Sequence, residues 1–192
     1  MFLRTLSRFG ARLVSVLLLA GCARDAAAPV GPAAAPDSAN AALLGLLPVR
    51  GVTRAMPLAQ DIAVSAVIGS NGGTLTIPEA GLTLVVPAGA VSSDVTFTAT
   101  ALAGKIVAYD FEPHGTKFAV PLQFNQDLRK TNLFATLTAP LLDGAYFADN
   151  SRLNQASGTA FVSELRSATV NLLQFRASFP IDHFSGYLIS WH

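Results

Sequence analysis

The sequence predicts an all-β protein, an antiparallel β-sandwich, and three observations lead to this prediction. Apolar residues alternate with other residues at period two in Val95–Ala101 and Phe118–Phe124, as in strands with one buried face. Gly and Pro recur between short strand-like runs, and no window of twelve residues in this region carries a clean helical stripe. Many short strands joined by turns pack as two facing sheets. The residues expected to face inward are Phe97, Phe118, Val120 and Leu122, with Pro121 marking an edge or a bulge.

The strands are most clearly marked within Gly72–Val91. Thr74–Ile77 and Leu82–Val86 have strand character. Pro78–Gly81 between them predicts a turn, because proline presets φ and glycine accepts positive φ. Pro87 ends the second strand or places it at an edge, since proline cannot donate to a central ladder. We expect this block to be structural rather than catalytic.

Further strands are expected on the C-terminal side of this block. Ala103–Lys105 predicts a turn that joins Thr96–Leu102 and Ile106–Phe111 as a hairpin. Ala168–Phe175 and Tyr187–Trp191 are expected to be the last strands.

The N-terminus, residues 1–21, is predicted to be a lipoprotein signal peptide. Three arginines precede the apolar run Leu13–Ala20, which is too short to span a bilayer. Leu19–Cys22 resembles the lipobox of bacterial lipoproteins, in which signal peptidase II cleaves before a cysteine that is diacylated on sulfur. The alternative is an ordinary signal peptide followed by an unrelated cysteine. Cys22 is the only cysteine in the chain, so lipid acceptance explains it better than a disulfide does. Ala23, in place of Asp, favours the outer membrane by the same resemblance.

Composition divides the rest of the chain into a tether and a domain. Residues 22–55 are expected to form a lipid-anchored flexible tether, because their Ala- and Pro-rich first part cannot bury enough apolar surface to order itself. Residues 56–192 are expected to form the folded domain. Without Arg4, Arg8 and Arg12, ten basic residues face twelve acidic ones, a net charge of −2. The remaining basic residues are scattered, so nucleic acid is not an expected partner.

Four motifs of the folded region occur in the order of one known family. They are Gly72-Gly73, Val86–Val91, Phe111–Phe118 followed by Pro121, and His183–Tyr187. Over Ile68–Trp191 the sequence therefore resembles the ZU-five domain of zona-occludens proteins, netrin receptors, ankyrins and the death-domain protein PIDD. The resemblance implies a β-sandwich used as a protein-interaction module, here with an unknown partner at the cell envelope.

The resemblance also implies a reaction, because similar domains cut their own backbone between Phe and Ser of a His-Phe-Ser triplet. His183-Phe184-Ser185 matches that triplet. A serine hydroxyl needs a neighbouring base, and an imidazole is well suited, so His183 would activate Ser185 to attack the Phe184 carbonyl. Gly186 would give the turn its freedom. The alternative is that His183 and Ser185 only cap the last strand.

Other candidate sites are weaker. His114 and Glu112 could be read as metal ligands, but no third ligand follows at suitable spacing, and a turn histidine is expected instead. Gly69–Gly73 lacks the Gly-Lys-Ser/Thr end of a phosphate loop and is expected to be a β-turn. No cofactor, no metal and no enzyme acting on an external substrate are expected.

Two classes of function stay open. The first is a lipid-anchored interaction or structural module at the bacterial envelope, facing the periplasm or the cell exterior. The second is a ligand-binding sandwich, for example for glycans, which would need exposed aromatic residues. Trp191, Tyr109, Tyr146 and Tyr187 together on one open face would favour the second class.

Overall fold

A computed structural model describes residues 46–135 and 141–191 of the chain. The predicted signal peptide, Cys22 and the tether as far as residue 45 lie outside the described residues. No helix in the described part of the chain is long and apolar enough to cross a membrane.

The described region consists of strands and three short 3-10 turns, with no α-helix, so the prediction of an all-β fold is confirmed. The strands are β1 (Leu47–Gly51), β2 (Thr53–Leu58), β3 (Ile62–Ile68), β4 (Gly73–Ile77), β5 (Leu82–Val86), β6 (Val95–Ala101), β7 (Gly104–Ile106), β8 (Ala108–Glu112), β9 (Lys117–Asp127), β10 (Leu142–Phe147), β11 (Leu153–Asn154), β12 (Thr159–Val162), β13 (Glu164–Ser167), β14 (Thr169–Asn171), β15 (Arg176–His183) and β16 (Gly186–Trp191). The 3-10 turns are η1 (Leu128–Lys130), η2 (Asn132–Ala135) and η3 (Asn150–Arg152).

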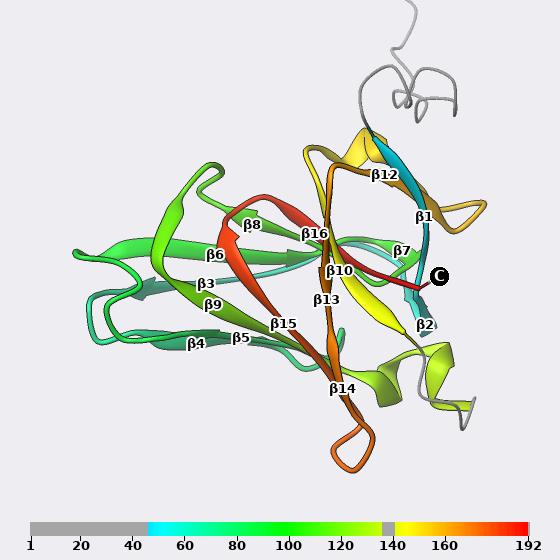
Figure 1. Ribbon diagram of the computed structural model, residues 1–192, viewed down its shortest axis with the longest axis horizontal. Helices are drawn as coiled ribbons and strands as arrows, with labels where there is room; N and C mark the ends of the chain where they lie inside the picture. Colours follow the sequence, from blue (N-terminus) through cyan, green and yellow to red (C-terminus); the bar gives the residue numbers. More distant parts are fainter. Residues whose placement is uncertain (1–45, 136–140, 192) are drawn as a thin grey trace, which may run out of the picture. The chain divides into compact units, whose positions relative to one another are not determined.

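Two antiparallel sheets form the sandwich (Figure 1). The first has the order β11-β12-β1-β16-β8-β6-β3, and β10 and β13 join it on the other side of β16. The second has the order β14-β15-β9-β5-β4. β2 and β7 pair as a small third sheet. The chain passes from the second sheet to the first between β15 and β16.

Aromatic side chains fill the core between the sheets. Phe97 of β6 is fully buried, and Phe124 of β9 stacks on Phe179 of β15 with 4.4 Å between the ring centroids. Leu122 is also fully buried, and Phe118 is half-buried with its ring 5.7 Å from that of Phe97. The inward orientation predicted for Phe97 and Leu122 is therefore confirmed, and Phe118 packs at the rim of the core.

Val120 does not face inward as predicted, because β9 bulges at this point. Leu122 pairs with Ile181 and Lys117 with His183, so four residues of β9 oppose a single residue of β15. The bulge turns Val120 outward, with 39% of its surface exposed. The expectation of a bulge or an edge at Pro121 is confirmed.

The hairpins predicted around Gly72–Val91 and after β6 are present. β4 pairs with β5 through the Pro78–Gly81 turn, where Gly81 has a φ of 80°. β6 pairs with β8, and the connection between them is longer than predicted because it contains β7. Pro87 follows directly after β5.

Two segments differ from the sequence-based expectation. Residues 47–55, expected in the tether, lie in β1 and β2; β1 pairs with β12 and β16, and Val52 is 1% exposed. Ala168–Phe175, expected to be one strand, holds only the three-residue β14 and a turn, and the long strand β15 follows it. Pro180 occupies an exposed position of β15, between the buried residues Phe179 and Ile181.

β16 is buried on both faces because the first sheet folds over. β1 pairs with β12, β10 pairs with β13, and β12 leads into β13, so these strands enclose a second apolar cluster. Tyr187 and Ile189 face the main core, whereas Leu188 lies in the second cluster. The last described residue, Trp191, is 40% exposed.

Replacing Phe97 by Ala should lower the free energy of unfolding by about 3–5 kcal/mol, because a large ring is removed from a fully buried site. Urea denaturation measures this change. Leu173→Ala is the matched control; its side chain is 95% exposed, and its effect should stay within about 0.5 kcal/mol. Equal effects of the two substitutions would contradict the core described above.

Candidate functional site

The His183-Phe184-Ser185 triplet lies at the crossing between the two sheets. His183 is the last residue of β15, and Gly186 is the first residue of β16. Phe184 and Ser185 form the connection, and both are buried, at 1% and 6% exposure. Any chemistry at the Phe184–Ser185 bond would therefore take place inside the fold.

Backbone hydrogen bonds hold this connection against the loop between β8 and β9. The Phe184 N–H donates to the Thr116 carbonyl over 2.9 Å, and the Gly115 N–H donates to the Phe184 carbonyl over 3.0 Å. The Phe111 N–H donates to the Ser185 carbonyl over 3.1 Å. The motif Phe111–Phe118 and the triplet, far apart in the sequence, thus form one structural unit.

The Phe184 ring fixes the position of the triplet. Its centroid lies 4.8 Å from that of Phe97, 5.5 Å from that of Phe111 and 4.8 Å from that of Phe118. The contacts with Phe97 and Phe118 are edge-to-face and the contact with Phe111 is stacked, which are the favourable arrangements for aromatic pairs. Phe184 therefore anchors the crossing in the main core.

The contacts of the His183 imidazole are with Tyr146, Tyr187 and Glu164. It meets the Tyr146 ring edge to face at 4.9 Å between centroids, and its Nδ1 lies 3.5 Å from the Tyr187 hydroxyl. Its Nε2 lies 3.7 Å from a Glu164 carboxylate oxygen. The Tyr187 hydroxyl donates to the His183 carbonyl over 3.0 Å. The ring and the backbone of His183 are thus both held by neighbours other than Ser185.

The Ser185 hydroxyl makes no hydrogen bond within the described part of the chain. The hydroxyl oxygen is not among the fully buried unpaired atoms, and the Phe184 carbonyl beside it accepts one N–H, that of Gly115. The connection thus places a serine hydroxyl next to a carbonyl that accepts one N–H. A base in contact with the hydroxyl is not part of it, because His183 is engaged elsewhere.

Gly186 has a different role from the one expected. Its φ is not positive, so its freedom at a turn is not used. A Cβ at this position would instead collide with the Phe147 ring. Glycine is needed here for close packing of β16 against β10.

The other sequence candidates do not form sites. His114 lies in the loop between β8 and β9, as expected for a turn histidine, and its Nε2 is 2.9 Å from a carboxylate oxygen of Asp110 in β8; Glu112 is exposed. Among the residues that the structure describes, no group of three His, Cys, Asp or Glu side chains could hold a metal ion. Tyr109 and Tyr187 are buried, so the four aromatic residues do not share an open face with Trp191.

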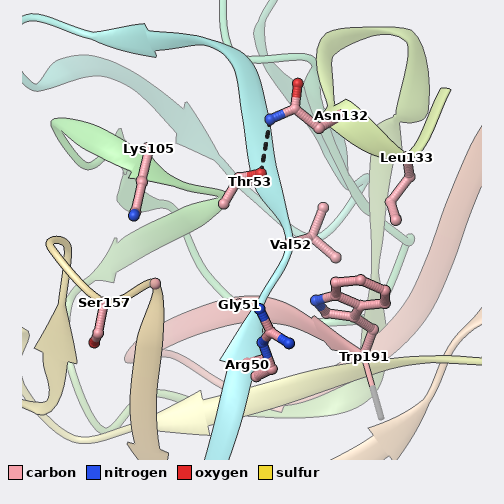
Figure 2. A pocket seen from close by; sticks show the side chains of 10 residues that line it. Arg50, Gly51, Val52, Thr53, Lys105, Asn132, Leu133, Ser157 and Trp191 are labelled. Atoms are coloured by element: carbon pink, nitrogen blue, oxygen red, sulfur yellow. Dashed lines mark hydrogen bonds between the residues drawn. The ribbon is translucent and has the colours of Figure 1, made fainter. Parts of the chain in front are cut away.

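A cleft of about 230 Å³ lies beside Trp191 (Figure 2). Arg50 and Lys105 line it, and the Arg50 guanidinium lies 5.6 Å from the Trp191 ring centroid. Figure 2 shows the Asn132 side chain donating to the Thr53 hydroxyl, over 2.8 Å. The sequence did not reveal this cleft, because its residues come from distant segments that only the sheet pairing brings together.

The sequence analysis also did not predict the buried arginine Arg54. Arg54, 3% exposed, donates to the Ala80 carbonyl and to the Ala108 carbonyl, each over 3.2 Å, and stacks on the Tyr109 ring at 5.1 Å. The Tyr109 hydroxyl lies 2.8 Å from the same Ala80 carbonyl and 2.7 Å from the Gln126 side-chain oxygen. Burial raises the pKa of the Tyr109 hydroxyl, and Arg54 opposes that rise. The network fixes the Pro78–Gly81 turn to β2, β8 and β9 and so has a structural role.

Tyr187→Phe should lower the free energy of unfolding at neutral pH by about 1 kcal/mol, because the hydrogen bond to the His183 carbonyl is lost. Burial, and next Glu164, raise the pKa of Tyr187 in the folded state. The stability from its neutral form is therefore full below about pH 10, the unfolded value, and is lost as the pH rises above it.

The variant should accordingly lose less stability than the parent between about pH 9 and pH 12, measured by urea denaturation at each pH. Part of the alkaline loss should remain in both proteins, since the pKa of Tyr109 is raised as well. Parallel stability curves for parent and variant would contradict this assignment.

A model of the ZU5 domain matches residues 64–105, from within β3 to within β7. This range contains the first two of the four motifs, Gly72-Gly73 and Val86–Val91. The third motif and the His183-Phe184-Ser185 triplet lie beyond the matched residues. A search of curated proteins gave no significant match. From β3 to β7, the chain is therefore similar to a ZU5 domain, the family that its motifs resemble.

Proposed function

We propose that residues 47–191 act as a protein-interaction module that a lipid on Cys22 holds at the bacterial cell envelope. The observation that carries the interaction role is the ZU5 match on a β-sandwich. The alternative, a glycan-binding sandwich, has less support, because Tyr109 and Tyr187 are buried and Trp191 is covered on one side by Arg50.

The anchor is supported by the sequence of the N-terminus. Leu19–Cys22 supplies a lipobox-like site, and the segment after it gives the domain reach from the lipid headgroups. The first strand that the structure describes begins at Leu47, so the proposed spacer is shorter than residues 22–55. We place the module at the outer membrane, facing the periplasm or the cell exterior.

Self-cleavage at Phe184–Ser185 is a second proposed property, favoured by the free Ser185 hydroxyl and the Gly115 N–H on the Phe184 carbonyl. The Ser185 oxygen would attack the Phe184 carbonyl carbon, and the acyl group would shift from nitrogen to oxygen. Water would then hydrolyse the ester, leaving a carboxylate on Phe184 and a free amine on Ser185. For His183 to accept the hydroxyl proton, its ring must leave the contacts with Tyr146 and Tyr187.

Cys22→Ser should abolish anchoring, because serine does not accept the diacylglyceryl group in thioether linkage. Wild-type protein from cells should partition into the detergent phase of a Triton X-114 extract with its signal peptide removed. The variant should be unprocessed or released into the aqueous phase. Wild type and variant found together in the aqueous phase would exclude the lipid anchor.

Ser185→Ala should leave a single intact chain, whereas wild type should yield a chain ending at Phe184 together with the C-terminal peptide. Denaturing mass spectrometry after incubation at neutral pH separates the two cases. Gel filtration does not, since β16 is paired with β8, β10 and β1 and would stay in the sheet after the cut.

Ser185→Cys should still cleave, because a thiol can make the same acyl shift. His183→Ala should slow the reaction. Ser190→Ala, which changes another buried serine and one that lies within β16, is the matched control and should cleave like the wild type. A wild-type chain that stays intact would reduce the triplet to a structural crossing.

A further inference from the structure

The first sheet has an open edge at β3. β3 is the last strand of that sheet and pairs with β6 along Ile62–Ile68; among residues 46–135 and 141–191 no strand pairs with its other side. Its backbone groups make no hydrogen bonds beyond that ladder within the described part of the chain. In an antiparallel edge strand the alternate N–H and C=O groups face outward, so β3 presents a row of free donors and acceptors.

β3 has none of the features that usually protect an edge strand. Natural edges are short, charged, bulged or broken by proline. The edges β11 and β14 have two and three residues, and β13 carries Glu164 and Arg166. β3 has seven residues, with no charge, no proline and an unbroken register.

The inner row of β3 is also incompletely covered. In the neighbouring strand β6, Phe97, Ala99 and Ala101 are fully buried. In β3 the core-facing residues Ile62, Val64 and Ala66 are only half-buried, although they pack against the same core. One further strand along this edge would complete their burial.

We infer that this edge pairs with β3 of a second copy of the chain, antiparallel about a twofold axis at Ser65. In this register Val64 lies opposite Ala66 of the second copy, and Ile62 opposite Ile68, so core-facing residues meet core-facing residues. On the outer face Ser65 meets Ser65, and Ala63 meets Val67, which is 68% exposed in the single chain. An interface of this kind is isologous and closes at two copies.

Charge opposes this self-pairing only at the two ends of the strand. No like charges oppose each other along the strand, because Ile62–Ile68 is uncharged. The nearest carboxylates lie at the two ends: Asp61 just before the strand, and Asp94 beside Gly69. Asp61 of one copy would face Gly69 of the other and so approach its Asp94. Added salt screens the repulsion between these two carboxylates and should therefore strengthen the association. The pairing requires neither the lipid anchor nor the self-cleavage.

Single cysteines on the exposed outer face of β3 test the register. The full chain carries Cys22→Ser, so that the introduced residue is the only thiol. Ser65→Cys should form a disulfide-linked dimer on mild oxidation, because residues directly opposite have Cβ atoms about 5 Å apart. Ala63→Cys and Val67→Cys are matched controls; alone, each places its thiols roughly 13 Å apart and should cross-link several-fold less. Mixed together, these two variants should cross-link with each other.

Sedimentation equilibrium of the Cys22→Ser parent gives a second measurement, independent of the introduced thiols. We expect a monomer–dimer equilibrium that shifts toward the dimer with added salt. A parent that stays monomeric, a Ser65→Cys chain that does not cross-link with itself, or equal cross-linking at all three positions would overturn the inference. Cross-linking of Ser65→Cys to a different protein only would also overturn it.

Discussion

The burial of Phe184 is the interaction on which the connection between the two sheets depends. Its ring lies among Phe97, Phe111 and Phe118, and its N–H and carbonyl are both bonded to the β8–β9 loop. The side chain and the backbone of one residue thus join β6, β8 and β9 to the crossing from β15 to β16. Aromatic burial supplies the driving force, and the two hydrogen bonds satisfy the peptide groups that burial would otherwise leave unpaired.

The same packing determines which groups surround the Phe184–Ser185 bond, where cleavage is proposed. In the proposed reaction the Ser185 hydroxyl would attack the Phe184 carbonyl, which accepts the Gly115 N–H inside the fold. The tyrosine contacts of His183 stabilise the crossing and keep the imidazole from the hydroxyl. In the proposed cleavage the His183 ring would have to leave these contacts, which otherwise stabilise the crossing.

Two strands of the first sheet, β16 and β3, differ in how completely their neighbours cover them. Around β16 the sheet folds over a second apolar cluster, so that both faces of this strand are covered. At the β3 end nothing in the described chain covers the edge, and a half-buried apolar row remains. Uncovered backbone donors beside apolar side chains favour association with another strand.

Much of the fold was determined by local sequence alone. The alternation in Val95–Ala101 and the turn at Pro78–Gly81 follow from side-chain period and backbone preference, which act over a few residues. The motif order also indicated the ZU5 resemblance, which the family match supports over residues 64–105. The tertiary structure decided those features that depend on strand pairing. β1 forms because β12 and β16 flank it, and Val120 turns outward because β9 bulges opposite β15.

At the candidate site, too, the sequence determined some features and the tertiary structure determined others. The sequence could place His183 and Ser185 two positions apart, but it could not say which neighbours the imidazole would meet, because Tyr146 and Glu164 come from other strands. The burial of Arg54 could not be predicted for the same reason, since its partners, the carbonyls of Ala80 and Ala108, come from separate hairpins. Sequence spacing determines which groups are available, and long-range packing determines which of them meet, because contact energies depend on distances that only the folded chain fixes.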